Sequence, residues 1–108
     1  MRPGDVVWVE LSPSRGREQD GRRPAVVVSS EYHLAAATTL VTVAPCTSRD
    51  RSWPNHVPLT GPVGLMAPTF AMTEQVRTIA RDRVKDVVGA VDEDCLSHIS
   101  AWIHRWLT

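Results

Sequence analysis

Short runs of β-forming residues, separated by turn residues, make up most of this chain and restrict it to a β-rich fold. Residues 6–11 contain three valines, a tryptophan and a leucine, and turn formers bound them at Gly4-Asp5 and Ser12-Pro13. This run predicts a strand that is apolar on nearly both faces. Because further short runs of the same kind follow, the chain favours a small, strongly curved β barrel.

The second and third strands are predicted around two prolines. Residues 25–29 are continuously apolar up to a serine, and Pro24 is expected at the first position of this strand. A third strand is predicted at residues 39–44, where Pro45 is expected to end it. Residues 12–22 predict an exposed loop, and residues 31–38 a short helical turn. The remaining strands are predicted at residues 55–60, 69–73, 76–79 and 84–91.

One amphipathic helix is predicted at the C-terminal end. Asp92 can cap its first turn, and Glu93 and Asp94 are favourable near the positive end of the helix dipole. Its apolar residues recur at spacings that put them on one face, namely Leu96, Ile99, Ile103, Trp106 and Leu107. This face must pack on the barrel or on a second chain. The predicted fold is therefore mainly β with helices (α+β).

The length of 108 residues suits one domain, residues 1–108. The longest apolar runs, at 25–28 and 34–37, are far shorter than the roughly 20 residues of a membrane-spanning helix. The first residues also lack the apolar stretch of a secretory signal, so we expect a cytoplasmic protein with no membrane association. In that reducing compartment, Cys46 and Cys95 are expected to be free buried thiols.

The charges balance, with 12 Lys and Arg against 12 Asp and Glu. This balance argues against attachment to nucleic acid by bulk charge alone. However, Lys85 is the sole lysine and every other cation is arginine, the side chain suited to two-pronged phosphate recognition. Two explanations of the arginine content remain open. One is a local phosphate-binding site, and the other is a genome of high GC content that encodes arginine in place of lysine.

Two polar side chains stand at the ends of strands that should be neighbours. Arg23 precedes the second predicted strand, and Thr47 follows the third. If these strands pair antiparallel, the start of one lies beside the end of the other, and the two side chains meet. A guanidinium and a hydroxyl directed at one point can bind a phosphate. The alternative is an ordinary surface arginine beside a threonine that ends a strand.

Five strings carry a resemblance to a known family. Residues 4–13 read GDVVWVELSP, 16–19 read GREQ, 22–29 read RRPAVVVS, 42–48 read TVAPCTS and 74–79 read EQVRTI. In this order and spacing they resemble the signature of the MazF and PemK toxin family over nearly the whole chain. The resemblance implies a dimeric SH3-like barrel that cuts single-stranded RNA without a metal ion or other cofactor. It also implies 2′,3′-cyclic phosphate and 5′-hydroxyl products, and inhibition by a cognate antitoxin with an acidic C-terminal tail.

The resemblance also implies site residues. The family's catalytic arginine falls on Arg23, and its catalytic threonine or serine on Thr47. The loop with Glu18 resembles the family's first loop, which moves at the RNA site and is affected by the antitoxin. Glu18 is a candidate base, or alternatively an exposed carboxylate paired with a neighbouring arginine. The expected substrate-binding residues are Arg17, Glu18, Gln19, Ser48, Trp53 and Gln75.

Trp53 and the histidines have competing interpretations. An exposed aromatic between arginines can stack an unpaired RNA base, whereas Trp53 could alternatively anchor its loop on the barrel. A ribonuclease mechanism with one histidine as base and another as acid is rejected, because the four histidines lie on the helix or in regions where the family varies. The cysteines and histidines show no close-spaced ligand pair, so no metal site is expected.

Two other functions remain open. The first is a binding inhibitor similar to the CcdB toxins, which act on DNA gyrase without chemistry and end in a helix carrying Trp-Gly-Ile. This chain ends in RWLT, a partial match only, and the Arg23 and Thr47 pair favours the nuclease. The second is a catalytically inactive barrel that only sequesters an antitoxin.

Overall fold

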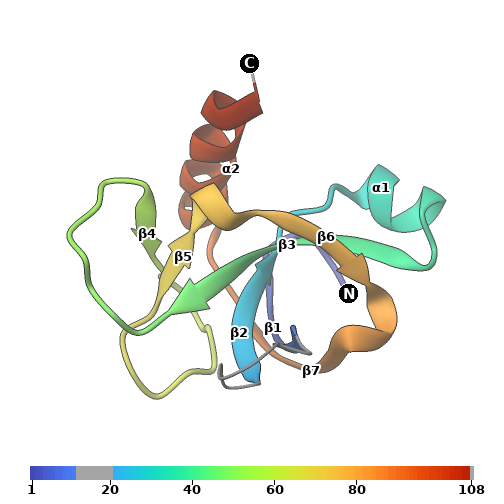
Figure 1. The fold of residues 1–108 in the computed structure, drawn as a ribbon, viewed down its shortest axis with the longest axis horizontal. Coiled ribbons are helices and arrows are strands. Elements are labelled where there is room, and N and C mark those ends of the chain that lie inside the picture. The colour runs from blue at the N-terminus through green and yellow to red at the C-terminus, as the bar shows by residue number, and fades with distance from the viewer. Residues whose placement is uncertain (12–20, 108) are drawn as a thin grey trace.

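The computed structural model describes residues 1–11 and 21–107 and consists mainly of β-strands, with one long helix at the C-terminal end (Figure 1). Two further elements, η1 and η2, are single turns of 3-10 helix. The elements follow the order β1 (Asp5–Glu10), β2 (Arg22–Val27), α1 (Glu31–Ala36), β3 (Leu40–Thr47), β4 (His56–Pro58), β5 (Phe70–Met72), η1 (Thr73–Gln75), β6 (Arg77–Ala80), η2 (Arg81–Arg83), β7 (Val84–Ala90) and α2 (Glu93–Leu107). No helix within the described ranges is long and apolar enough to cross a membrane.

The strands form an antiparallel sheet in the order β4-β5-β3-β2-β1-β7, and β6 pairs with β3. β3 is long enough to have two partners along one edge. Its first half pairs with β6, and its last two residues pair with β5. β6 and β7 stand at opposite edges in the order of paired strands and are joined by η2. No pairing connects these two strands within the described residues. Closure of the sheet into a barrel therefore stays a prediction.

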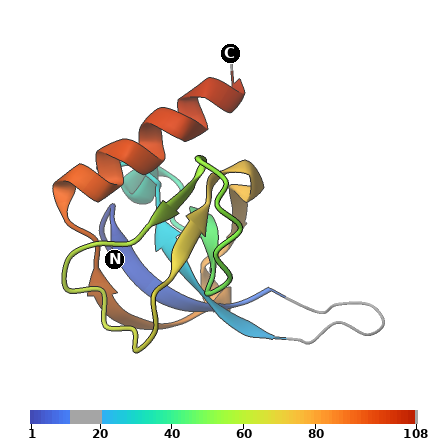
Figure 2. The ribbon, with the colours of Figure 1, turned by 90° about the vertical axis from the view of Figure 1, so that its left-hand side faces the viewer.

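Two hydrophobic clusters cover the two faces of the sheet, because successive side chains of a strand point to opposite faces. In β1, Val6 belongs to one cluster and its neighbour Val7 to the other. The first cluster includes Cys95 and Ile99 of α2, and Figure 2 shows this helix lying across one side of the strands. The predicted first strand, apolar on nearly both faces, is thus confirmed.

The C-terminal helix begins as predicted. The Asp92 carboxylate accepts a hydrogen bond from the backbone N–H of Cys95 at 2.9 Å, which caps the first turn. Ile99 is fully buried, but Trp106 and Leu107 are 47% and 71% exposed. The end of α2 projects beyond the strands that its first turns cover (Figure 2), so packing of these last two residues on a second chain stays a prediction.

Two predicted strand boundaries are also wrong, both at prolines. β2 begins at Arg22, before Pro24, and β3 continues through Pro45 to Thr47. The pairing between these two strands begins at Ala25 and Pro45. Beyond that point β2 stays extended through its pairing with β1, and β3 through its pairing with β5. The prolines therefore interrupt the pairing between β2 and β3 without ending either strand. The other strands and α1 form where they were predicted.

Replacing Ile99 by alanine is expected to lower the free energy of unfolding by about 2 to 5 kcal/mol. The side chain is fully buried against the sheet, so its removal leaves a cavity there. Urea denaturation would measure the loss, with His98→Ala on the exposed face of α2 as the control. Equal stability of the two variants would contradict this packing of the helix.

Candidate functional site

Arg23 and Thr47 lie at the same end of two paired strands. β2 and β3 are antiparallel, as predicted, and Ala25 is opposite Pro45. This is the last pair of the ladder, and Arg23 and Thr47 each lie two residues beyond it. Residues directly opposite each other share a face of a sheet, and so do residues two apart in one strand. Arg23 and Thr47 therefore lie on the same face, at the same end of the two strands.

The hydroxyl group of Thr47 has a defined local contact. Its Oγ1 accepts a hydrogen bond from the backbone N–H of Arg49 at 3.1 Å. Since this contact uses a lone pair, the hydroxyl proton can be donated to another group. Thr47 is half-buried and lies opposite Phe70 of β5, while Ser48 is exposed. The site thus offers one adjustable donor beside one arginine.

The neighbouring thiol of Cys46 is not a nucleophile. Burial and, to a smaller extent, nearby Cys95 raise its pKa to about 12, although the positive charge of Arg23 acts in the opposite direction. That effect requires the Arg23 guanidinium to lie within electrostatic range of β3. Both cysteines are free and buried, which confirms the expectation from the sequence.

Alkylation should therefore be very slow at Cys46. With a pKa of about 12, the thiolate fraction at pH 8 is about 10⁻⁴. In a Cys95→Ser variant, iodoacetamide is expected to label Cys46 at the rate of unfolding, and at the rate of a free thiol once urea is added. Rapid labelling of the folded variant would contradict this account.

Trp53 combines features of both of its interpretations. The indole is 48% exposed, yet its ring centroid lies 4.7 Å from that of His56. The guanidinium carbon of Arg51 lies 5.5 Å from the same indole, a cation–π distance. Trp53 is therefore anchored at His56 while much of its surface remains available.

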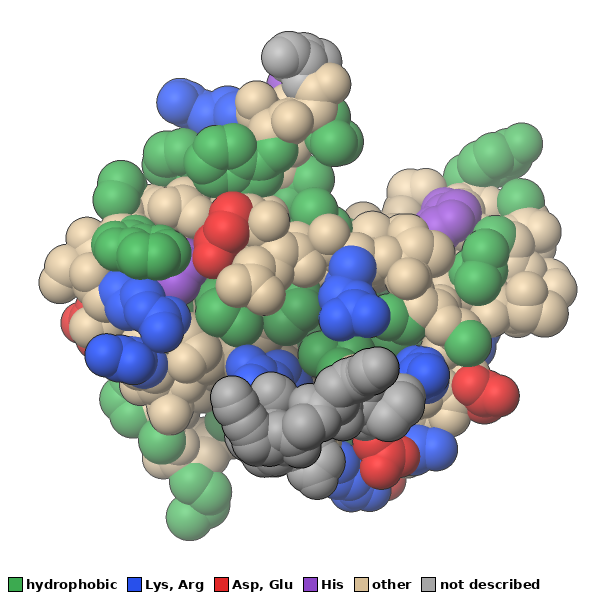
Figure 3. All heavy atoms as spheres, viewed as in Figure 1, with side chains coloured by type: hydrophobic (Ala, Val, Ile, Leu, Met, Phe, Trp, Pro, Cys, Tyr) green, Lys and Arg blue, Asp and Glu red, His purple; other side chains and the backbone are tan. Residues whose placement is uncertain are grey.

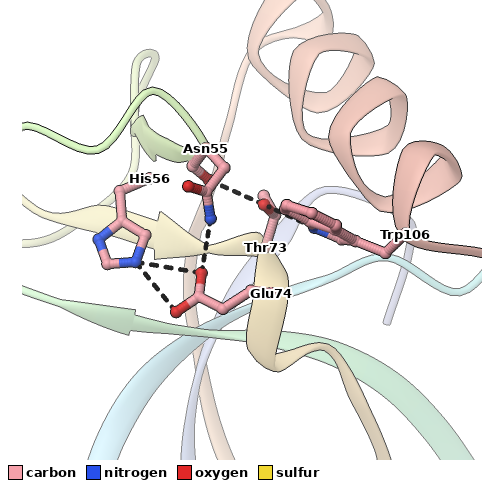
Figure 4. A network of polar contacts seen from close by, with 5 residues as sticks. All are labelled: Asn55, His56, Thr73, Glu74 and Trp106. Atoms are coloured by element: carbon pink, nitrogen blue, oxygen red, sulfur yellow. Dashed lines mark hydrogen bonds and ion pairs between the residues drawn. The ribbon is translucent and has the colours of Figure 1, made fainter.

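Figure 4 shows a polar network around His56 that the sequence patterns did not predict. Nε2 of the buried His56 lies 3.1 Å from both carboxylate oxygens of Glu74, and the Asn55 side-chain amide donates to one of them at 2.8 Å. The Thr73 hydroxyl donates to the Asn55 carbonyl at 2.8 Å and accepts from the Trp106 indole at 3.3 Å. Glu74 stands in one of the recognised strings, but nothing local in the sequence pairs it with a histidine 18 positions away.

Glu74 is held in its ionised form. Burial acts to raise its pKa, but hydrogen bonds from His56 and the backbone, together with the charge of His56, hold the pKa below its usual value. A lowered carboxyl pKa in the folded state stabilises the fold above the ordinary carboxyl pKa. This contribution is lost when the pH falls through the lowered value.

The other predicted residues fall into separate groups. Gln75 is exposed in η1, next to Glu74. Arg17, Glu18 and Gln19 lie outside the described residues. Lys and Arg side chains are spread across the face seen in Figure 3, in which acidic side chains are scattered.

Comparisons with known proteins identify the family of this chain. The model of a family described as the PemK-like, MazF-like toxin of type II toxin-antitoxin systems matches residues 2–107. Endoribonuclease MazF9 of Mycobacterium tuberculosis is 37% identical, over 94% of this chain and 98% of the relative. Endoribonuclease toxin MazF of Escherichia coli is 35% identical, over 94% of this chain and 88% of the relative.

Solved structures share the fold. The crystal structure of MazF from Deinococcus radiodurans has a TM-score of 0.81 at 28% identity, covering 99% of this chain and 96% of that one. A crystal structure of MazE-MazF from the same organism gives 0.82 at 28% identity, covering 99% and 95%. Since the family model spans nearly every residue and relatives above 30% identity cover most of the chain, this protein belongs to the PemK-like, MazF-like toxin family of type II toxin-antitoxin systems.

Proposed function

We propose that this chain is a sequence-specific endoribonuclease toxin that cleaves single-stranded RNA without a metal ion and leaves 2′,3′-cyclic phosphate and 5′-hydroxyl ends. Its membership of a family whose curated relatives are endoribonucleases supports the activity. The observation that supports the chemistry is the antiparallel pairing of β2 with β3, in which the last pair, Ala25 and Pro45, lies two residues from Arg23 and from Thr47. The proposal includes one domain, residues 1–108, whose sheet closes as an SH3-like barrel.

Arg23 stabilises charge in the proposed reaction. The ribose 2′-oxygen attacks the adjacent phosphorus, the bond to the 5′-oxygen breaks, and negative charge builds on the non-bridging oxygens. One fixed donor directed at such charge is commonly worth about 3 to 4 kcal/mol of barrier. A guanidinium, with a pKa above about 12, is a poor base, so its role here is electrostatic.

Thr47 orients the phosphate. Its oxygen is engaged by the Arg49 N–H, so its proton is donated to a non-bridging oxygen of the substrate. The 2′-hydroxyl must lose a proton, and the leaving 5′-oxygen must gain one. Glu18, outside the described residues, is the candidate base for the first of these transfers.

The remaining predicted residues bind the RNA in this proposal. The half-exposed Trp53 indole, with Arg51 beside it, suits stacking on an unpaired base. Exposed Ser48 and Gln75 are available for polar contacts, and Arg17 and Gln19 are assigned to binding by resemblance.

The direct test is cleavage of a long single-stranded RNA by the purified chain in excess EDTA. We expect discrete fragments whose 5′ ends are phosphorylated by polynucleotide kinase without prior phosphatase treatment. Intact RNA would contradict the proposal. A DNA gyrase supercoiling assay run in parallel distinguishes the CcdB-like alternative, which requires inhibition of supercoiling without RNA cleavage.

Two partners belong to the proposal. A cognate antitoxin would cover the arginine-bearing site with an acidic segment that folds on binding, and the MazE-MazF structure from Deinococcus radiodurans supports an antitoxin of the MazE kind. A second copy of the chain is the other partner. A groove of about 610 Å³ lies between α1, β6 and α2, and the exposed Leu107 lies at its edge, which suits a homodimer contact. Sedimentation as a monomer at micromolar concentration would contradict the dimer.

A further inference from the structure

The segment between β3 and β4, residues 48–55, is held at both of its ends. At its start, the Thr47 hydroxyl accepts from the Arg49 N–H. At its end, Asn55 is bonded through its carbonyl to Thr73 and through its side chain to Glu74. We call residues 48–55 the β3–β4 loop. Both ends of this loop are therefore tied to groups that lie in or beside the proposed site.

The middle of the loop is also constrained, immediately before Trp53. Ser52 has φ of +60°, a left-handed conformation that is uncommon outside glycine. Its N–H donates to the Asp50 carboxylate at 2.9 Å, which stabilises this turn. Such backbone strain persists only where surrounding contacts hold it. The direction of the indole is thus set by the loop and not by a regular strand or helix.

His56 links Trp53 to Glu74. Its backbone N–H donates to the Trp53 carbonyl at 3.0 Å, and its buried ring packs against the indole. Nε2 of the same ring donates to the Glu74 carboxylate, whereas Nδ1 has no hydrogen-bond partner among the described residues. Glu74 therefore provides the polar contact that orients this ring.

Strand register puts this assembly on the face that carries Thr47. Thr47 is opposite Phe70, and His56 is opposite Met72, two residues further along β5. Directly opposite residues share a face, and so do residues two apart in one strand. Thr47 and His56 are thus separated by two strand spacings and two residue rises, on the order of 12 Å. β3, β5 and β4 follow one another in this way in Figure 1.

We propose, on the basis of the RNA cleavage proposed above, that His56 and Glu74 are positioning residues for RNA selection. Glu74 orients the His56 imidazole, the imidazole supports the Trp53 indole, and the indole stacks on an unpaired base close to the scissile phosphate held by Arg23 and Thr47. Selection of that base then depends on a carboxylate that touches no part of the RNA.

A double-mutant cycle tests this linkage. The probe is a fluorescein-labelled single-stranded RNA, 2′-O-methylated at every ribose so that it cannot be cleaved, and the readout is Kd from fluorescence anisotropy. We expect Trp53→Ala to weaken binding about tenfold and Glu74→Ala about fivefold. The double variant should also be about tenfold weaker, because Glu74 acts only through the indole. Glu74→Gln, which keeps an acceptor oxygen, should recover most of the affinity.

The matched control is Glu31→Ala. Glu31 lies on the distant helix α1, and its carboxylate is also paired with a basic side chain, that of Arg2. This substitution should leave Kd unchanged. Independent effects of Trp53→Ala and Glu74→Ala, which multiply to about fiftyfold in the double variant, would overturn the proposal. Thermal unfolding of each variant shows whether weaker binding results from unfolding of the protein. If Glu74→Ala unfolds, the comparison is made with Glu74→Gln in its place.

Cleavage of a random-sequence RNA pool provides a second readout that separates this inference from the proposed function. Sequencing of the 5′-hydroxyl ends should show that Trp53→Ala and Glu74→Ala relax the base preference at the same position. Cleavage with unaltered preference would overturn the inference and leave the proposed function intact. Coupled effects on RNA binding, together with no cleavage by the unmodified chain, would support the role of His56 and Glu74 in orienting Trp53 and contradict the nuclease proposal.

Discussion

Replacing Arg23 by alanine is expected to lower kcat for RNA cleavage by about 10²- to 10³-fold, the usual effect of removing one donor that stabilises transition-state charge. Arg23 lies at the exposed start of β2 and shares a face with Thr47 through the pairing of β2 with β3. An alanine there leaves the strand pairing unchanged, since the backbone of this residue pairs with Val9 in β1. The loss should therefore appear in the rate and not in stability. Single-turnover cleavage of a short RNA measures it.

Arg22→Ala is the matched control for Arg23. Arg22 is the adjacent exposed arginine of the same strand, and its side chain points to the opposite face. It carries the same charge, so its loss tests whether positive charge alone accounts for the rate. Arg23→Lys should recover only part of the activity, because a lysine cannot make two-pronged contacts with a phosphate. Equal losses in the Arg22 and Arg23 variants would remove Arg23 from the mechanism.

The second large effect is expected at Thr47. Replacement by valine keeps the shape and removes the hydroxyl, and we expect kcat to fall by about 10²-fold. The hydroxyl oxygen accepts from the Arg49 N–H, which leaves its proton available for the phosphate. Serine retains this donor, so Thr47→Ser should keep most of the activity. The same single-turnover assay compares the two variants.

Thermal unfolding controls for the loss of the Arg49 contact. Arg49 is exposed, so its N–H can bond to water in the valine variant and little stability should be lost. A valine variant that cleaves RNA as fast as the serine variant would show that the hydroxyl has no part in the chemistry. In that case Arg23 would act without it.

Local patterns were sufficient for the elements and for the pairing of two of the strands. Alternating apolar residues predict β1, and the spacing of Leu96, Ile99 and Ile103 predicts the packed face of α2. The antiparallel pairing of β2 with β3 could be predicted because two consecutive strands joined by a short connection usually pair in this way. The strand boundaries predicted at the two prolines were wrong. The rule that proline begins or ends a strand is local and contains no information about which partner strand supplies the hydrogen bonds.

The contacts around Trp53 could not be obtained in that way. His56 comes from β4 and Glu74 from η1, and only the pairing of β4 with β5 brings them together. Secondary structure depends on the order of side chains along the chain, which is a local property. A side-chain contact between two distant segments depends on the path of the backbone between them, and many sequences of intervening loops are compatible with the same strands. The sequence by itself therefore determines which segments form strands and helices. The orientation of Trp53 against His56, which is bound to the Glu74 carboxylate, is decided only by the folded sheet.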